Sequence, residues 1–254
     1  MNTNTSKIRS APMHLSASRA SKDKEMNDHK HPNESPVKTK GFLIRWGSFY
    51  DSVVNLLTLG QAKRLRTMTI DQAMLKPGEK LLDVGCGTGG VTIPAKERIG
   101  QNGWVTGIDP SPEMIAVARK KAVRAGLNID FRIGAIESLP YTNESFDVVT
   151  SSLMMHHLPH DVQVKGLAEI YRVLKPGGRL LIADAMQPRN FLMKLLFTFL
   201  TRYHGLKFGV EDLQETLKSA RFSHNSHLDE HFLMIGFVYA EKPTDAVSKT
   251  LAQL

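Results

Sequence analysis

Cysteine is almost absent from this chain of 254 residues, since Cys86 is the only one. The shortage excludes a disulfide framework, a zinc site built from several cysteines, and chemistry that needs more than one thiolate. We predict no metal site and a reducing, cytoplasmic location. Long apolar segments are also missing: no run reaches 18 residues, so no segment is predicted to span a membrane.

Acidic residues are fewer than basic ones, 25 against 33, which gives a formal charge of +8. Residues 1–40 contribute half of this excess, with eight basic and four acidic residues. The remaining charge is spread over the rest of the chain, without the basic stripe and interleaved aromatic residues of a nucleic-acid groove. We therefore expect no nucleic-acid partner.

Periodic apolar residues are missing from residues 1–40 as well. Such a segment cannot offset its ordering entropy, so the sequence predicts a disordered basic tail there. The first 22 residues lack acids and contain several serines, a composition faintly similar to an organelle transit peptide. A dispensable tail and a targeting segment both stay open.

From residue 42 onward, apolar residues recur with the period of one helix face: Phe42, Trp46, Phe49, Val53 and Leu56. This pattern predicts an N-terminal helical lid over residues 41–75, with Gly60 as a helix stop. A catalytic domain is expected to follow over residues 76–245.

Strand and helix patterns alternate through residue 185. The expected strands are 80–84, 103–109, 129–133, 146–151 and 179–184, the last following a "KPGG" turn, and the expected helices are 88–99, 111–125 and 161–174. A further helix is expected near 211–219, and the run 231–242 is strand-like. Such alternation predicts β-α-β crossovers and an α/β fold with a mainly parallel sheet covered on both faces.

The segment "LLDVGCGTGG", residues 81–90, reads as a buried strand that enters a glycine turn. It fits two ligand patterns, G-x-G-x-x-G at Gly85, Gly87 and Gly90, and D-x-G-x-G-x-G at Asp83, Gly85, Gly87 and Gly89. A dinucleotide would place its pyrophosphate at the following helix N-terminus. S-adenosylmethionine instead carries an ammonium group, a carboxylate and a sulfonium, and would favour a nearby acid.

Two acids follow these strands. Asp83 would repel a pyrophosphate and is placed to pair with an ammonium group, directly or through water. Asp109 follows Gly85 by 24 residues and is placed to accept hydrogen bonds from both ribose hydroxyls. This second acid fits a nicotinamide dinucleotide equally well.

Four segments in order over about 105 residues resemble the successive motifs of class I S-adenosylmethionine-dependent methyltransferases: "LLDVGCGTGG", "VTGIDPSPEMIAVARKKA", "FRIGAIESLPYTNESFDVVTSS" and "EIYRVLKPGGRLLIADA". Nicotinamide enzymes do not supply the last two in these places. The resemblance implies a Rossmann-like, mainly parallel seven-stranded sheet flanked by helices, with the last strand antiparallel. It also implies S-adenosylmethionine as the cofactor.

The upstream segment "FYDSVVNLLTLGQAKRLR" is similar to that of methyltransferases that modify ubiquinone and menaquinone precursors at ring carbon. There the match covers residues 49–185. Two departures stand out. Ala135 replaces the aspartate that those relatives place on the adenine amino group, and "MMHHLP" replaces an Arg-Asn pair after the fourth strand.

The resemblance implies cofactor contacts from Tyr50, Asp83, Gly85, Cys86, Gly87, Gly89, Asp109, Pro110, Met114, Ala135, Ile136 and Ser151. Backbone of Ala135 and Ile136 would contact the adenine edge, and Tyr50 and Asp51 would close over the methyl donor. His156 and His157 are candidates for a general base. A histidine that caps or packs the following loop is the alternative.

The segment "FLMKLLFTFL", residues 191–200, has eight apolar residues in ten, so as a helix it would be buried or face lipid. No acid lies between Asp184 and Glu211, as an anionic membrane surface would favour. A plain lid or core helix and peripheral membrane contact through 191–203 both stay open. Either way, an apolar acceptor pocket is expected.

Together these observations predict methyl transfer to a hydrophobic small molecule: a quinone precursor, a lipid head group or a secondary metabolite. Two alternatives remain at this point. One is a catalytically silent, cofactor-binding partner subunit, which the missing aspartate at position 135 suggests. The other is an NAD-dependent oxidoreductase.

Overall fold

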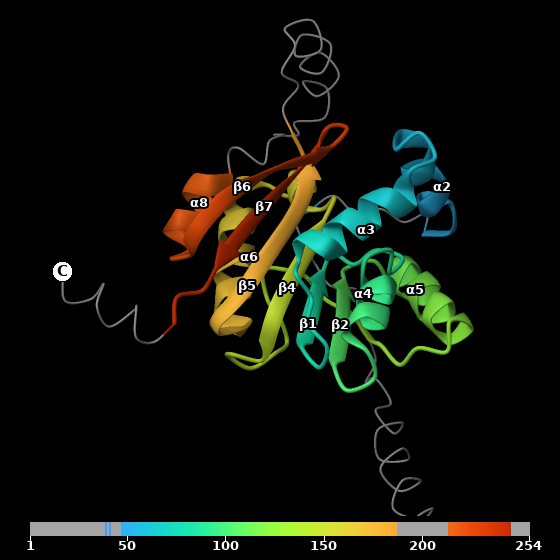
Figure 1. Ribbon diagram of the computed structural model, residues 1–254, viewed down its shortest axis with the longest axis horizontal. Coiled ribbons are helices and arrows are strands. Elements are labelled where there is room, and N and C mark those ends of the chain that lie inside the picture. Colours follow the sequence, from blue (N-terminus) through green and yellow to red (C-terminus); the bar gives the residue numbers. More distant parts are fainter. Residues whose placement is uncertain (1–38, 40, 42–46, 187–212, 245–254) are drawn as a thin grey trace, which may run out of the picture. The chain divides into compact units, whose positions relative to one another are not determined.

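A mainly parallel sheet forms the centre of the computed structural model, which describes residues 39, 41, 47–186 and 213–244 (Figure 1). The strand order in this part of the chain is β3-β2-β1-β4-β5-β7-β6. The parallel strands are β1 (Lys80–Val84), β2 (Trp104–Asp109), β3 (Asp130–Ile133), β4 (Phe146–Ser152) and β5 (Leu174–Ala185). The last strand, β7 (Ile235–Glu241), runs antiparallel to β5 and to β6 (Ser223–Phe232), which confirms the expected fold class.

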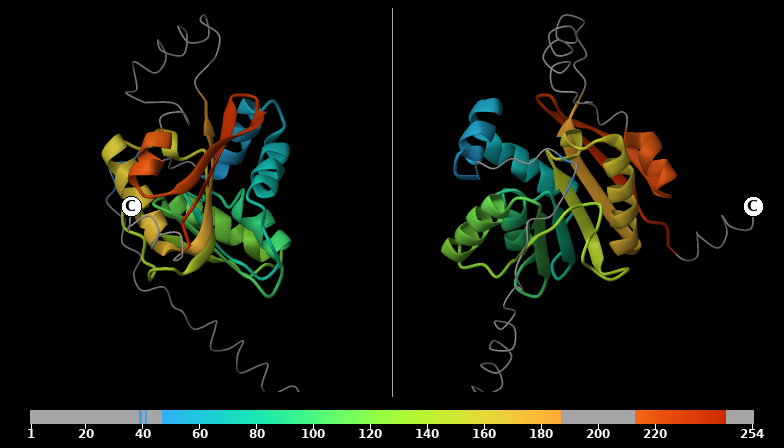
Figure 2. Two further views of the ribbon diagram at one scale, coloured as in Figure 1. Left: turned by 60° about the vertical axis from the view of Figure 1, so that its left-hand side comes forward. Right: turned by 180° about the vertical axis from the view of Figure 1, so that it is seen from behind.

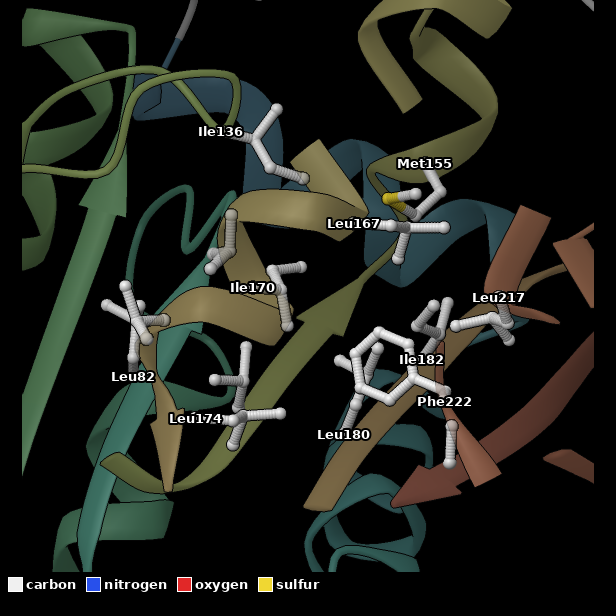
Figure 3. Close-up of a cluster of buried hydrophobic side chains, with 14 of the residues drawn as sticks. Leu82, Ile136, Met155, Leu167, Ile170, Leu174, Leu180, Ile182, Leu217 and Phe222 are labelled. Carbon is white, nitrogen blue, oxygen red and sulfur yellow. The ribbon is translucent and has the colours of Figure 1, made fainter. Parts of the chain in front are cut away.

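Helices cover both faces of the sheet (Figure 2). In β1, the adjacent residues Leu81 and Leu82 point to opposite faces, yet both are fully buried. Leu82 belongs to the core cluster beneath α6 (His160–Val173) and α8 (Leu213–Ser219), which Figure 3 shows. Leu81 belongs to the cluster beneath α3 (Ala62–Gln72) and α4 (Thr92–Ile99).

Helix α5 (Pro112–Arg124) begins and ends as its sequence predicts. The Ser111 hydroxyl accepts a hydrogen bond from the backbone N–H of Met114 at 3.3 Å, and Pro112 occupies the first helical position. Gly126 follows the helix with a φ of +66°. These local signals fix the ends of α5, and its buried residues Ile115, Ala118 and Ala122 pack it against Phe131 of β3.

Helix α4 begins at Thr92, four residues later than expected. The glycine turn extends further than the sequence suggested, since Gly85, Gly87 and Gly89 all have positive φ. Pro94 lies in the first turn of α4, where its missing N–H would have no intrahelical partner in any case.

The C-terminal strands differ from the prediction. The run 231–242 is not one strand, because a turn with Leu233 at a φ of 54° separates β6 from β7. Strand β6 was not predicted at all. The "KPGG" segment lies within β5, which begins at Leu174, and the register shifts between Phe146 and Val148 of β4.

Helices α2 (Gly47–Leu57) and α3 form the described part of the expected N-terminal helical segment. The tail over residues 1–40, except Thr39, lies outside the described residues. Phe42, Trp46 and the apolar segment 191–203 lie outside them too. Among the helices that are described, none is long and apolar enough to cross a membrane.

Candidate active site

Two adjoining cavities lie at the carboxyl ends of β1, β2 and β4, where the glycine turn leaves the sheet. Tyr50, Gly85, Gly87 and Leu153 line both cavities. The larger cavity extends toward β2 and the segment after β3, and the smaller one lies against α2, α3 and the glycine turn. The carboxyl edge of a parallel sheet is where open α/β folds bind their ligands.

The glycine turn presents bare backbone to these cavities. A Cβ at Gly85 would lie 2.4 Å from Cγ of Met154, so any side chain there would collide. A Cβ at Gly87 would approach the Tyr50 ring at 3.7 Å. Gly89 faces the other way, toward Phe131 and Ala118, so it packs the turn against α5 and lines neither cavity.

Asp83 ends deep in the smaller cavity. Its carboxylate accepts hydrogen bonds from the hydroxyls of Thr92, at 2.5 Å, and Thr150, at 2.8 Å. Burial raises the pKa of Asp83 to about 6, and the nearby Asp109 adds to the shift. An unliganded carboxylate in this position is costly, and a cationic ligand would relieve that cost.

Asp109 lines the larger cavity at the end of β2. Its two oxygens accept hydrogen bonds from the backbone N–H groups of Gly87 and Ser111, each at 2.9 Å. These bonds orient the carboxylate, while burial raises its pKa to about 6. Asp109 fits the ribose of either ligand, whereas the buried Asp83 beside the glycine turn would repel a pyrophosphate, so a dinucleotide is not favoured.

The segment after β3 forms one wall of the larger cavity. Gly134, Ala135, Ile136 and Glu137 line it, opposite Pro110 and Met114 at the start of α5. Oε2 of Glu137 is buried and has no hydrogen-bond partner among the described residues. Sequence reasoning stressed the aspartate missing at position 135 and overlooked this carboxylate two residues later.

Helix α2 is attached to the site through Asp51. Its carboxylate accepts hydrogen bonds from Arg66 of α3, at 2.9 Å, from Thr88 of the glycine turn, at 3.0 Å, and from Lys121 of α5. Burial raises the pKa of Asp51, but these partners outweigh it and the net pKa is lowered. Asp51 therefore ties together the elements around the cavities, and its neighbour Tyr50 is the residue that lines them.

Arg66 was not among the candidate site residues, although the sequence showed it within a basic run. It lines the smaller cavity, and its guanidinium packs so closely on Gly90 that a Cβ there would lie 2.9 Å from Nε. Arg66 of α3 and the buried Asp83 therefore line the same cavity. The smaller cavity holds charges of both signs.

The two histidines occupy different places on the 3-10 helix η1 (Met155–His157) that follows β4. His156 pairs through Nδ1 with the buried Asp184, which also accepts a hydrogen bond from the His156 backbone N–H at 3.1 Å. His157 lines the larger cavity, and His156 does not. Burial and the adjacent His156 lower the pKa of His157 to about 4, so its imidazole is neutral near pH 7.

Of the two remaining candidates for cofactor contact, Cys86 lines a cavity and Ser151 does not. Cys86 lines the smaller cavity, where burial raises the pKa of its thiol well above the usual value. Ser151 is fully buried and lines neither cavity, while its neighbour Ser152 lines the smaller one. Strand alternation explains the difference, because consecutive residues of β4 point to opposite faces.

Comparison with known proteins shows the family to which the chain belongs. A family model described as a methyltransferase domain matches residues 81–178. The demethylmenaquinone methyltransferase of Lactobacillus johnsonii is 38% identical over 166 residues, which cover 64% of this chain and 67% of that enzyme. The enzyme of the same name from Listeria monocytogenes is 34% identical over 200 residues, covering 75% and 83%.

Solved structures share the fold at lower identity. A SAM-dependent methyltransferase from Aquifex aeolicus matches with a TM-score of 0.61 and 22% identity, over 75% of this chain and 97% of that one. The [4+2]-cyclase SpnF matches with a TM-score of 0.57 and 22% identity, over 71% and 81%. These likenesses concern the fold alone, and the cyclase shows that the fold does not fix the reaction.

The glycine turn, its two acids and the strand order define a methyltransferase domain of the Rossmann-like kind. The chain belongs to the class I S-adenosylmethionine-dependent methyltransferases, in the branch that contains the demethylmenaquinone methyltransferases. Membership implies S-adenosylmethionine as its cofactor, in agreement with the resemblance seen in the sequence.

Proposed function

We propose that the chain transfers the methyl group of S-adenosylmethionine to a ring carbon of a hydrophobic quinone precursor. The observation that carries this proposal is the composition of the larger cavity. It runs from the cofactor acid Asp109 to an apolar end formed by Leu153, Met154 and Leu158, with His157 as a polar group among them. The names of the relatives support a quinone-type acceptor.

The described residues fit the cofactor in both cavities. In the larger one, the Asp109 carboxylate would accept hydrogen bonds from the ribose hydroxyls, and the backbone at Ala135 and Ile136 would meet the adenine edge. The unpartnered Glu137 oxygen would accept a hydrogen bond from the adenine amino group, in place of the missing aspartate. Buried acceptors without donors are rare in native proteins, so a ligand donor is a natural partner.

The smaller cavity suits the amino-acid end of the cofactor. The Asp83 carboxylate would face the ammonium group, and the Arg66 guanidinium would face the carboxylate. A charge-assisted contact of each sign fixes the orientation of a zwitterion. The methionine part would thus lie along the glycine turn, under Tyr50.

S-adenosylmethionine, when bound, supplies a methyl group on a sulfonium that needs no further activation. The protein has to align and polarise the acceptor and exclude water while the methyl group is transferred. Tyr50 and Met154 close the space around Gly85 and Gly87. A neutral His157 imidazole would accept a hydrogen bond from an acceptor hydroxyl, which increases electron density at the neighbouring ring carbon.

The pKa of about 4 determines whether His157 can take a proton from the acceptor. A phenolic hydroxyl has a pKa near 10, so complete proton transfer to this imidazole would be unfavourable. His157 therefore holds and polarises the acceptor, and the ring proton that the new C–C bond displaces leaves to water. His156, paired with Asp184, supports the η1 turn from outside the cavity.

Labelled methyl transfer tests the proposal. The purified chain would be incubated with methyl-labelled S-adenosylmethionine and either a demethylated naphthoquinol or a phosphatidylethanolamine dispersion, and the extracted products would be analysed by mass spectrometry. We expect carbon-bound label in the quinol only. Label in the amine head group would overturn the acceptor class, and cofactor binding without any product would support a silent partner subunit.

A further inference from the structure

Large apolar residues lie exposed on α2 and in the turn after it, beside the exposed Ser52 and Asn55. Phe49, Leu56, Leu57 and Leu59 retain 68%, 76%, 73% and 74% of their accessible surface. They belong to α2 and to the turn after it, which lie at the periphery of the domain in each view of Figures 1 and 2. Single exposed apolar residues are ordinary, but a group of four large ones marks an interaction site.

The inner side of α2 already has its partners. Tyr50 and Val54 line the cavities, and Thr58 donates a hydrogen bond to the Val54 carbonyl at 2.8 Å. Residues 50, 54 and 58 share one side of the helix by their spacing of four. The domain therefore does not need the outward residues for its own core, and a surface helix would normally be polar there.

The charged residues that follow this apolar face along the chain have one sign. No acidic residue occurs between Asp51 and Asp71, while Lys63 and Arg64 lie exposed in the first turn of α3, directly after the α2 turn. Arg66, the third base of this run, is engaged with Asp51. We call Phe49, Leu56, Leu57, Leu59, Lys63 and Arg64 the α2 surface.

We propose that the α2 surface docks on an anionic lipid bilayer. Apolar side chains that can enter the acyl boundary, flanked by cations that meet anionic head groups, are the chemistry of an interfacial helix. A second copy fits less well, since a two-fold contact would bring the cations of both copies together without an acid of the same surface to pair with them.

The inference rests on the proposed function in one respect, the hydrophobic acceptor. A prenylated quinone precursor is dissolved in the membrane, and the inner face of α2 lines the cavities that would receive it. Docking through the outer face would therefore bring the membrane next to the site without any spanning segment.

Vesicle co-sedimentation of the full chain tests the α2 surface. Vesicles of phosphatidylglycerol and phosphatidylcholine are compared with phosphatidylcholine alone. We expect binding to the anionic vesicles, reduced at least about tenfold in Leu56→Gln/Leu57→Gln. In Lys63→Gln/Arg64→Gln, binding to the anionic vesicles should fall about fivefold for each cation removed. Val123→Gln/Val164→Gln removes exposed apolar residues from α5 and α6 and should bind as the parent does.

Three results would overturn the inference. Unchanged vesicle binding of Leu56→Gln/Leu57→Gln would show that the α2 surface does not bind the bilayer. A lower melting temperature of that variant without vesicles would show that the chain itself covers the face, and a change in its solution mass would show a second copy there. Intact vesicle binding without quinol methylation would refute the proposed function and leave docking standing.

Discussion

The cofactor side and the acceptor side of the active site use different chemistry. At the ends of β1 and β2, backbone groups and the buried carboxylates of Asp83 and Asp109 line the cavities, and hydrogen bonds fix each carboxylate. Beyond β4, the cavity wall is apolar, and His157 is the polar side chain that η1 contributes to it. The first side recognises charges and hydroxyls in fixed directions, and the second selects by shape and apolarity.

This difference explains how one domain can keep its cofactor while acceptors vary within the fold. Directional groups tolerate little change, because an unpartnered buried carboxylate is costly. Apolar contacts are non-directional and tolerate exchange at similar volume. Substitutions on the cofactor side should therefore change mainly the affinity for the cofactor. Substitutions on the acceptor side should change mainly the turnover rate.

The largest effect is expected from His157→Ala on the acceptor side. Loss of the hydrogen bond that polarises the acceptor should lower kcat about 100-fold, the lower end for one contact that stabilises developing charge, with cofactor affinity unchanged. Steady-state kinetics and calorimetry on the same sample would measure both. His160→Ala, an exposed histidine at the start of α6, is the matched control. An equal decrease of kcat in both variants would show that His157 does not act on the acceptor.

On the cofactor side, Asp83→Ala should weaken S-adenosylmethionine binding by about 1.5–3 kcal/mol, as expected for a lost charge-assisted contact. Titration calorimetry would measure the change. Asp130→Ala, at the amino end of β3, removes an acid from the opposite edge of the sheet and should have no effect on affinity. An unchanged affinity in the Asp83 variant would refute its assignment to the ammonium group.

Glu137→Leu should remove discrimination between adenine and hypoxanthine. The parent chain is expected to bind S-adenosylhomocysteine about tenfold better than its inosine analogue, since the exocyclic amine donates to the buried carboxylate oxygen. The leucine variant should bind both alike, and Glu137→Gln, which keeps an acceptor oxygen, should retain most of the preference. A preference that survives in Glu137→Leu would place the amine elsewhere.

Cofactor affinity should also depend on pH around 6. The pKa values of Asp83 and Asp109 lie at about 6 in the ligand-free protein, against 3.8 for an ordinary aspartate. Their ionised forms favour the cationic ligand, so affinity should fall as pH drops through about 6, by up to about tenfold per unit for each group.

Stability of the ligand-free protein should show the opposite trend. Between about pH 4 and pH 6, Asp83 and Asp109 hold protons in the folded chain that the unfolded chain has released, so their contribution to the unfolding free energy decreases as pH rises. His157, whose pKa is lowered to about 4, contributes the opposite slope over the same range and offsets part of this decrease. Denaturation at several pH values, with and without cofactor, would reveal both slopes. A cofactor affinity that stays constant from pH 7.5 down through pH 6 would show that the two carboxylates are not perturbed.

The cofactor side was predictable because its information is local. The strand of Leu81 and Leu82, the glycine turn and the Ser111 cap of α5 each follow from a few consecutive residues. A motif does not say which way each residue points. In the structure Gly89 faces α5 and the buried Ser151 lines neither cavity, and their assignment to the cofactor stays a prediction.

The acceptor side depends on contacts between distant segments, so less of it could be predicted. The η1 helix turns His157 into the cavity and His156 toward Asp184, a choice made by tertiary packing. Strand β6, with its polar sequence "SHNSHLDEHF", lies at the sheet edge and forms by pairing with β7 rather than from its own pattern. Arg66 and Glu137 reach the cavities from α3 and from the loop after β3, and nothing in their local sequence indicates it.

Titration calorimetry tests the central claim most directly, namely that the buried Asp83 beside the glycine turn selects a cationic methyl donor over a dinucleotide. The purified chain would be titrated at pH 7.5 with S-adenosylmethionine and, separately, with NADH. We predict saturable binding of the methyl donor and no measurable heat from the dinucleotide. Binding of NADH without binding of S-adenosylmethionine would contradict the account.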